Sequence, residues 1–214
     1  ACTAPYGPVY ICLDAAVQEM QISDWPEFND IGRYHSPSPP NAPVGVVEEA
    51  AKMLLSADNP LILAGRMLRN EEAWKKRIRL AEAVGAKVVN NSWQEVGFPT
   101  NHPLHVPNIA GFFVGGPVRD AHEAAEVVLS LDWFDLGGTL NHAWDGKIVK
   151  PKIINCSMDF QLHNGWSKDH GQLAPVDLHV PTTPEAFIDQ LLPLVEKAEK
   201  VKTYEVLEPV AVGL

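Results

Sequence analysis

The stretch PLILAG, from Pro60 to Gly65, is a continuous apolar run of strand length that ends in a glycine. A strand that is apolar at every position is typical of a parallel sheet covered by helices on both faces, whereas a half-exposed strand would alternate apolar and polar residues. The stretch therefore predicts a buried central strand, with helices before and after it in the chain and similar strands beside it.

Amphipathic helices are predicted on both sides of this strand. The helix before it has apolar residues at helical spacing, namely Val44, Val47, Ala51, Leu54 and Leu55. The helix after it is expected to begin at an Asn70 cap and to end at Gly85, with an apolar face formed by Trp74, Ile78, Ala81 and Val84.

The same alternation continues to the end of the chain. Strands are predicted at KVVNNS (87–92), VVLSLDW (127–133), KIINCSM (152–158) and VDLHV (176–180). A helix is expected to start near Pro117, and another at a Thr cap in TPEAFIDQLLPLVEKAEK (183–200), whose stripe is Phe187, Ile188, Leu191, Leu192 and Val195 and which Pro193 is expected to kink. Strands that alternate with helices in this way predict an α/β domain with a doubly wound, parallel sheet.

Length and charge limit the function classes. A chain of 214 residues favours one domain with appendages. With 17 Lys and Arg against 27 Asp and Glu, the net charge of -10 argues against a nucleic-acid or anionic-membrane partner. No apolar run approaches the roughly 20 residues of a membrane helix. Cys2, Cys12 and Cys156 have no paired spacing, and buried, reduced thiols are expected. These features predict a soluble, cytoplasmic protein.

Prolines divide the first part of the chain from the rest. Pro26, Pro37, Pro39, Pro40 and Pro43 make residues 23–43 an extended connector, because such a stretch sustains neither a helix nor a central strand. Before it lies one apolar run, Pro8 to Leu13, in residues 1–22. Since one strand cannot form a domain, residues 1–22 are expected to end a preceding unit.

Candidate binding residues follow the apolar runs, because open parallel sheets bind ligands at the carboxyl ends of their strands. Gly65 lets a phosphate approach the backbone, and Arg66 can pair with it. The full GxGxxG fingerprint is absent. Asp132 and Asp135 precede Gly137 and Gly138, and this pattern fits an acid–base pair or a ribose and phosphate contact, but equally a helix cap or turn.

Other catalytic patterns are missing from the sequence. There is no GxSxG elbow, P-loop, HExxH or Cys/His arrangement. His102 and His105 have a spacing that could suit a metal, but Pro103 breaks any helix there and no further ligand follows. The sequence therefore predicts no catalytic residue and no metal ligand within this chain.

Five segments, in order, resemble the central domain of thiamine diphosphate-dependent enzymes of the acetolactate synthase and benzoylformate decarboxylase type. The segments are YGPVYICLDAAVQ (6–18), AAKMLLSADNPLILAGRML (50–68), LAEAVGAKVVNNSWQEVGFPTNHPLHV (80–106), AAEVVLSLDWFDLGGTL (124–140) and KIINCSMD (152–159). The resemblance implies a Rossmann-like, six-stranded parallel sheet in a three-layer α/β/α domain.

The resemblance also implies a division of the chain. Residues 1–22 would be the trailing strand of an upstream pyrimidine-binding domain, 23–43 a proline-rich linker, 44–200 the central domain, and 201–214 a linker to a downstream diphosphate-binding domain. Thiamine diphosphate and Mg²⁺ would be held by those two other domains of a homodimeric or homotetrameric parent enzyme that acts on 2-keto acids or related carbonyl compounds. The chain alone would then be an inactive fragment.

Some relatives bind FAD or ADP in the central domain, and the resemblance maps that function onto five residues. Gly65 and Arg66 match their glycine-rich turn, and Asp132, Phe134 and Asp135 match a later loop. The sequence departs from those relatives at Met67, where they often have a further glycine. Two alternatives remain open: a free-standing FAD-, ADP- or NAD-binding module, and a purely structural interaction domain.

Overall fold

The computed structural model describes residues 3–5, 7–91, 96–108, 114–159 and 173–198. The chain forms two units, Ala1–Pro39 and Pro40–Leu214. The expected linker to a downstream domain, 201–214, lies outside the described residues, as does Cys2.

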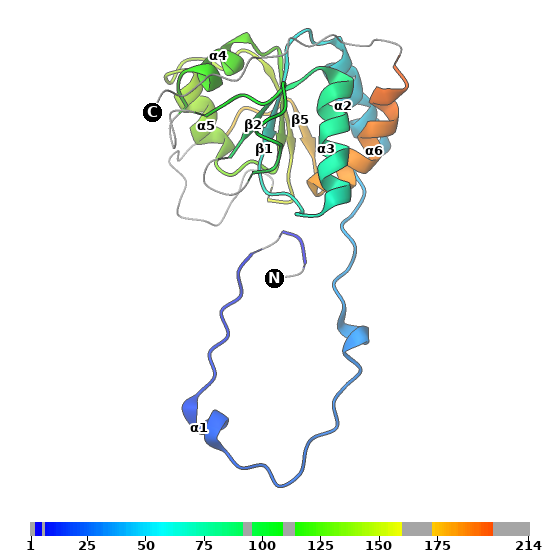
Figure 1. The fold of residues 1–214 in the computed structure, drawn as a ribbon, viewed down its shortest axis with the longest axis vertical. Helices are drawn as coiled ribbons and strands as arrows, with labels where there is room; N and C mark the ends of the chain where they lie inside the picture. Colours follow the sequence, from blue (N-terminus) through cyan, green and yellow to red (C-terminus); the bar gives the residue numbers. More distant parts are fainter. Residues whose placement is uncertain (1–2, 6, 92–95, 109–113, 160–172, 199–214) are drawn as a thin grey trace. The chain divides into compact units, whose positions relative to one another are not determined.

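The second unit is built on one parallel sheet (Figure 1). Its strands are β1 (Pro60–Ala64), β2 (Lys87–Asn90), β3 (Val127–Leu131), β4 (Lys152–Cys156) and β5 (Leu178–Val180). The spatial order is β2-β1-β3-β4-β5, so the chain moves outward from β1 to β2 and then returns to the other side of β1. This reversal places a topological switch point between β1 and β3.

The expected sixth strand is reduced to one bridge. His105 bridges Val88 of β2 in parallel, and Val88 N–H donates to Leu104 O at 2.8 Å while Val106 N–H donates to Val88 O at 2.8 Å. Proline precedes and follows this short stretch, and a residue without an N–H cannot extend a ladder. The described residues therefore hold five strands, with residues 104–106 beside the outer edge of β2.

Among the described residues of the second unit, five helices accompany the sheet. They are α2 (Val44–Ser56), α3 (Glu71–Val84), α4 (Pro117–Ala124), α5 (Leu136–Ala143) and α6 (Pro184–Glu196). The predicted caps of α3 are confirmed, because Asn70 accepts from Ala73 N–H and Gly85 takes a left-handed φ of 63°. Thr183 caps α6 as predicted. The α6 helix continues past Pro193 to its end.

Two helical faces differ from the prediction. Val44 is 69% exposed because it is the first residue of α2, and the buried face of this helix begins only at Val47. The buried face of α3 is shifted: Arg77 and Leu80 are buried, whereas Trp74 and Ile78 are only half-buried. For the helix α5, the sequence offered only a helix cap or turn near Asp135 and did not predict the residues of the helix itself.

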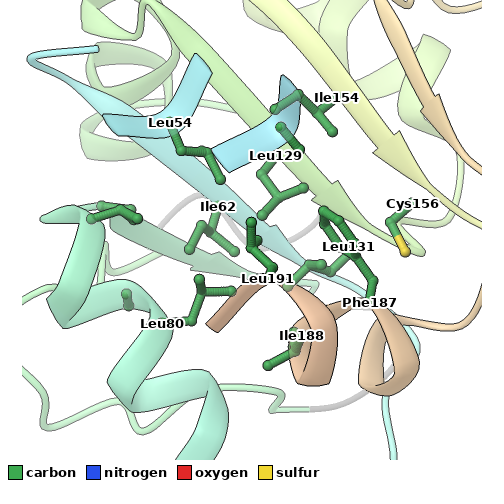
Figure 2. Packing of buried hydrophobic residues seen from close by; sticks show 14 of the residues in the cluster. Leu54, Ile62, Leu80, Leu129, Leu131, Ile154, Cys156, Phe187, Ile188 and Leu191 are labelled. Carbon is green, nitrogen blue, oxygen red and sulfur yellow. The ribbon is translucent and has the colours of Figure 1, made fainter. Parts of the chain in front are cut away.

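Two apolar clusters, one on each face of the sheet, make the three-layer α/β/α arrangement. In β1, Ile62 belongs to the cluster under α2, α3 and α6, whereas Leu61 and Leu63 belong to the cluster under α4 and α5. All five residues of β1 are buried. Figure 2 shows the first cluster, where Leu191 and Phe187 of α6 lie near Leu129 and Leu131 of β3. The α/β fold predicted from PLILAG is confirmed.

The first unit contains α1 (Ala15–Glu19) and a 3-10 helix, Ile31–Tyr34. Residues 8–13 form no strand within it, and their assignment to an upstream domain stays a prediction. Cys12 is exposed, so the expectation of a buried thiol is wrong for Cys12 in this structure, whereas Cys156 is buried as expected.

The second unit begins at Pro40, close to the expected start of the central domain at residue 44, and that domain boundary stays a prediction. Ala42 is 3% exposed, and its backbone pairs twice with the Gln190 amide of α6, at 2.8 Å and 3.0 Å. Prolines around Ala42 suggested a linker, but this pairing fixes the stretch to α6.

Candidate functional site

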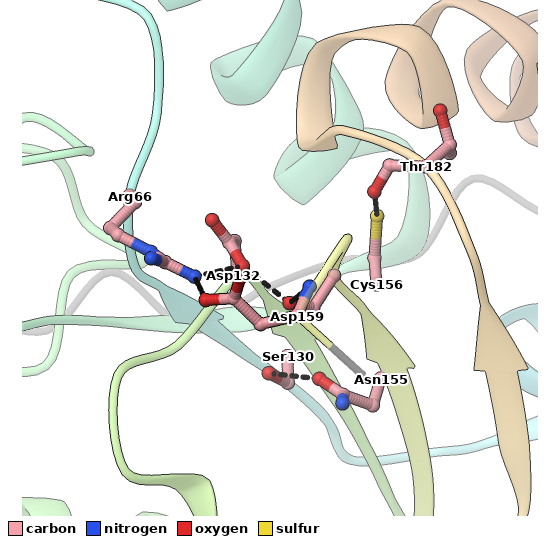
Figure 3. A network of polar contacts seen from close by, with 8 residues as sticks. Arg66, Ser130, Asp132, Asn155, Cys156, Asp159 and Thr182 are labelled. Carbon is pink, nitrogen blue, oxygen red and sulfur yellow. Dashed lines mark hydrogen bonds and ion pairs between the residues drawn. The ribbon is translucent and has the colours of Figure 1, made fainter. Parts of the chain in front are cut away.

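Polar side chains meet at the carboxyl ends of three adjacent strands (Figure 3). Arg66 follows β1, Asp132 follows β3, and Asp159 follows β4. Arg66 Nη2 donates to Asp132 Oδ1 at 2.8 Å and also to Asp159 Oδ2. One guanidinium therefore links the ends of three strands, beside the switch point where ligands bind in this type of sheet.

Ser157 links the carboxylate of Asp132 to the backbone of Asp159. Ser157 Oγ donates to Asp132 Oδ1 at 2.6 Å, and Asp159 N–H donates to Ser157 Oγ at 3.0 Å. Ser157 is 6% exposed, so these contacts are shielded from water. The hydroxyl thereby helps to hold both aspartates in position without a ligand.

The backbone of the Gly65–Arg66 turn is held equally firmly. Gly65 N–H donates to Leu131 O, and Arg66 N–H donates to Asp132 O, both at 3.1 Å. A Cβ on Gly65 would lie 2.3 Å from Asp132 O, which is far inside contact distance. Gly65 is thus required by the close approach of the β3 loop.

Electrostatically, the cluster carries more negative than positive charge. Partial burial alone lowers the pKa of the Arg66 guanidinium, but the charges and hydrogen bonds of Asp132 and Asp159 outweigh it and raise that pKa above its usual value. Arg66 Nε is buried, with no hydrogen-bond partner among the described residues. Two carboxylates against one guanidinium leave a net charge near -1.

The other two predicted binding residues, Phe134 and Asp135, lie on the loop after β3 and not in the Arg66 cluster. Asp135, with a left-handed φ of 53°, is the N-cap of α5 and accepts from Gly138 N–H at 3.1 Å. The helix-cap alternative for Asp135 is therefore confirmed. Phe134 is half-buried on the same loop. Of the five predicted binding residues, the structure brings Gly65, Arg66 and Asp132 together.

Ser157 and Asp159 are the members of the cluster that the sequence analysis missed. Ser157 directly follows KIINC and Asp159 comes after Met158, and the same rule that singled out Arg66 and Asp132 applies to that strand end. Their partners lie 25 and 93 residues away in the chain, so only the order of the strands shows that they meet.

A pocket of about 420 Å³ lies next to this cluster, between the loop after β1 and the first turns of α3. Met67, Trp74 and Val96 contribute to its lining, together with Arg77. Arg77 is 5% exposed, stacks on Trp74 at 5.5 Å, and lies 3.7 Å from the Glu185 carboxylate. The only cation buried beside this pocket is thus already compensated among the described residues.

His102 and His105, whose spacing could suit a metal, each have other contacts in the structure. Among the described residues, no group of three His, Cys, Asp or Glu side chains is placed to hold a metal ion. His102 Nε2 lies 3.3 Å from Glu82 Oε1, and His105 lies in the bridge to β2, where burial lowers its pKa. In the same described part of the chain, no helix is long and apolar enough to cross a membrane.

Comparison with known families identifies the family of the chain. The sequence profile of the thiamine pyrophosphate enzyme central domain matches residues 47–191, which is more than half of the chain and includes all five strands. The chain belongs to this family. The central domain begins in the profile a few residues after the start of the second structural unit.

The chain is similar in sequence to one known protein and in fold to another. Over 113 residues, or 49% of the chain, it is 33% identical to a "probable acetolactate synthase large subunit" of Methanocaldococcus jannaschii, of which it covers 18%. Its fold is similar to that of benzoylformate decarboxylase from Polynucleobacter necessarius, with a TM-score of 0.60 and 20% identity over 93% of this chain and 35% of that one. The central domain thus spans well under half of either relative.

The described residues do not fit the cofactor that the family name implies. Thiamine diphosphate and its Mg²⁺ would need a carboxylate-rich cation site and free backbone N–H groups for the phosphates. No such cation site exists among the described residues, and the N–H groups of Gly65 and Arg66 are already hydrogen-bonded. The same two N–H groups would be needed for the phosphates of FAD or ADP.

Proposed function

We propose that this chain is the central, non-catalytic domain of a thiamine diphosphate-dependent enzyme that forms or cleaves a carbon–carbon bond beside the carbonyl of a 2-keto acid or related compound. The observation that carries the proposal is the family match over residues 47–191. The names of the synthase and decarboxylase relatives support the substrate class. When bound, the thiamine ylide supplies the nucleophile and the electron sink.

Thiamine diphosphate and Mg²⁺ would be held by a pyrimidine-binding and a diphosphate-binding domain of the parent. This division agrees with the lack of a suitable ligand set among the described residues of the central domain. The role of this chain is then mechanical: the domain holds the two neighbouring domains at the right distance and orientation. Arg66 links the ends of its strands. A homodimeric or homotetrameric parent in the cytoplasm stays a prediction.

The test compares the isolated chain with its parent. With thiamine diphosphate and Mg²⁺ supplied, the 214-residue chain should not consume pyruvate or benzoylformate, whereas the parent protein should consume a 2-keto acid. The parent reading frame should also encode an activating glutamate upstream and a glycine–aspartate–glycine motif downstream. Turnover by the isolated chain, or a reading frame that lacks both features, would falsify the proposal.

The two alternative functions have less support. A free-standing nucleotide-binding module would need open donors at the carboxyl ends of the strands, and the donors of the Gly65–Arg66 turn are occupied. A purely structural interaction domain predicts a stable complex with a partner encoded by a different gene. Finding both cofactor domains in the same reading frame would exclude that alternative.

A further inference from the structure

The Gly65–Arg66 turn has a glycine and an arginine, two residue types that bind phosphates at strand ends, but its donors already have acceptors. A phosphate at such a turn is normally bound by backbone N–H groups and by a nearby arginine. Here both N–H groups donate to the β3 backbone, at Leu131 O and Asp132 O. The Arg66 guanidinium donates to Asp132 and Asp159, and its Nε is buried.

The acceptors carry negative charge, as a phosphate would. Two carboxylates converge on one Arg66 nitrogen from the ends of β3 and β4, and Ser157 holds one of them at 2.6 Å. Their side chains are only 16% exposed. A diphosphate that approached Arg66 would meet two fixed negative charges at short range, with little water to screen them.

We propose that Asp132 and Asp159 act as a built-in anion that takes the place of a nucleotide diphosphate against Arg66, and thereby closes the central domain to ADP, FAD and NAD. Phosphate binding by the Arg66 guanidinium is then a latent property of this strand end, which removal of the two negative charges exposes. The proposal concerns the 214-residue chain alone, so it stands or falls independently of the function proposed for the parent.

The test uses ADP, FAD and inorganic pyrophosphate as probes in calorimetric titrations of the full chain. The unmodified chain should show no saturable binding up to about 1 mM of each probe. The double variant Asp132→Asn, Asp159→Asn should gain affinity for pyrophosphate and ADP by about tenfold or more, because Arg66 then lacks a charged partner. Asn tolerates the left-handed φ of 52° at position 132, so the fold should be retained.

Two controls make the gain specific. Adding Arg66→Gln to the double variant should abolish the gained affinity. Asp145 is a matched aspartate outside this cluster: it also has a left-handed φ, of 49°, and it pairs with Arg119 at 2.8 Å. The variant Asp145→Asn should leave the titrations unchanged. Circular dichroism and a cooperative thermal transition confirm folding of each variant.

Each outcome decides the proposal. A gain that depends on Arg66 supports it. Micromolar nucleotide binding by the unmodified chain overturns it, since the site would then be open. A folded double variant that binds no better than the unmodified chain also overturns it, because the two carboxylates would not be what excludes the ligand.

Discussion

At the scale of single residues, the second unit depends on a few positions where backbone and side chain approach closely. Gly65 lies against the carbonyl of Asp132, and Asp132 itself takes a left-handed φ of 52°. His122 of α4 is fully buried, and its ring meets the ring of Trp144 edge-on, with 6.0 Å between the ring centroids. These residues are where substitution or protonation should affect stability most.

Replacing Gly65 by Ala should lower the free energy of unfolding by about 3 kcal/mol, because the new Cβ would force the β3 loop away from β1. The matched control is Gly45→Ala in α2, where a Cβ meets nothing within 4 Å and alanine favours the helix. Urea unfolding followed by circular dichroism measures both. Equal stability of the two variants would contradict the steric argument.

His122 should make the domain acid-sensitive. Burial lowers the pKa of its imidazole, although the Nδ1 hydrogen bond to Val118 O at 2.8 Å opposes this, and Nε2 has no partner among the described residues. Between the lowered pKa of folded His122 and its ordinary pKa, the imidazole therefore stays unprotonated in the folded chain but takes up a proton in the unfolded chain. Stability should be fully present above about pH 6.5 and fall as the pH drops from there toward the folded-state pKa.

The His122→Phe variant isolates that contribution, since phenylalanine keeps a buried ring but cannot be protonated. Its urea midpoint should change less between pH 7.5 and about pH 5 than that of the unmodified chain. His179→Gln changes an exposed histidine on β5 and should keep the original pH dependence. The explanation fails if His122→Phe and the unmodified chain lose stability in parallel.

At the scale of elements, helix caps and apolar runs could be predicted because they are encoded locally. PLILAG, Asn70, Gly85 and Thr183 gave the correct strand and helix ends. By contrast, α5 was missed because LGGTLNHA contains two glycines, which disfavour a helix. The Arg66 cluster could be predicted only in part, since the sequence marks strand ends but does not give the order of strands that brings β4 beside β3.

Asn70→Ala tests how much one cap contributes to α3. The loss of the side-chain bond to Ala73 N–H, at 2.8 Å, should reduce the free energy of unfolding by about 1 kcal/mol. Asp14→Ala removes a similar cap from α1, a helix with no buried residue, and should not change the unfolding of the second unit. Chemical denaturation monitored by tryptophan fluorescence compares the two. A smaller effect at Asn70 than at Asp14 would contradict this account.

At the scale of the whole molecule, the second unit should be an independent folding unit that starts at Pro40. A chain of residues 40–214 should have the same unfolding midpoint as the second unit of the full chain. A chain of residues 44–214 loses both hydrogen bonds between Ala42 and Gln190 and should be less stable by about 1–3 kcal/mol. Calorimetric melting curves decide this, and equal stability of both truncations would move the boundary back to residue 44.

The strand order has a consequence for biosynthesis. Because β1 lies between β2 and β3, one of its edges stays without a partner until residue 131 has been translated, 67 residues after Ala64 by the difference of their numbers. At about 5–20 residues per second, that edge is open for roughly 3–13 s on the ribosome. During that interval the nascent chain presents unpaired backbone N–H and C=O groups at this edge and the uncovered apolar side chains of Leu61 and Leu63, the kind of surface that chaperones protect from aggregation.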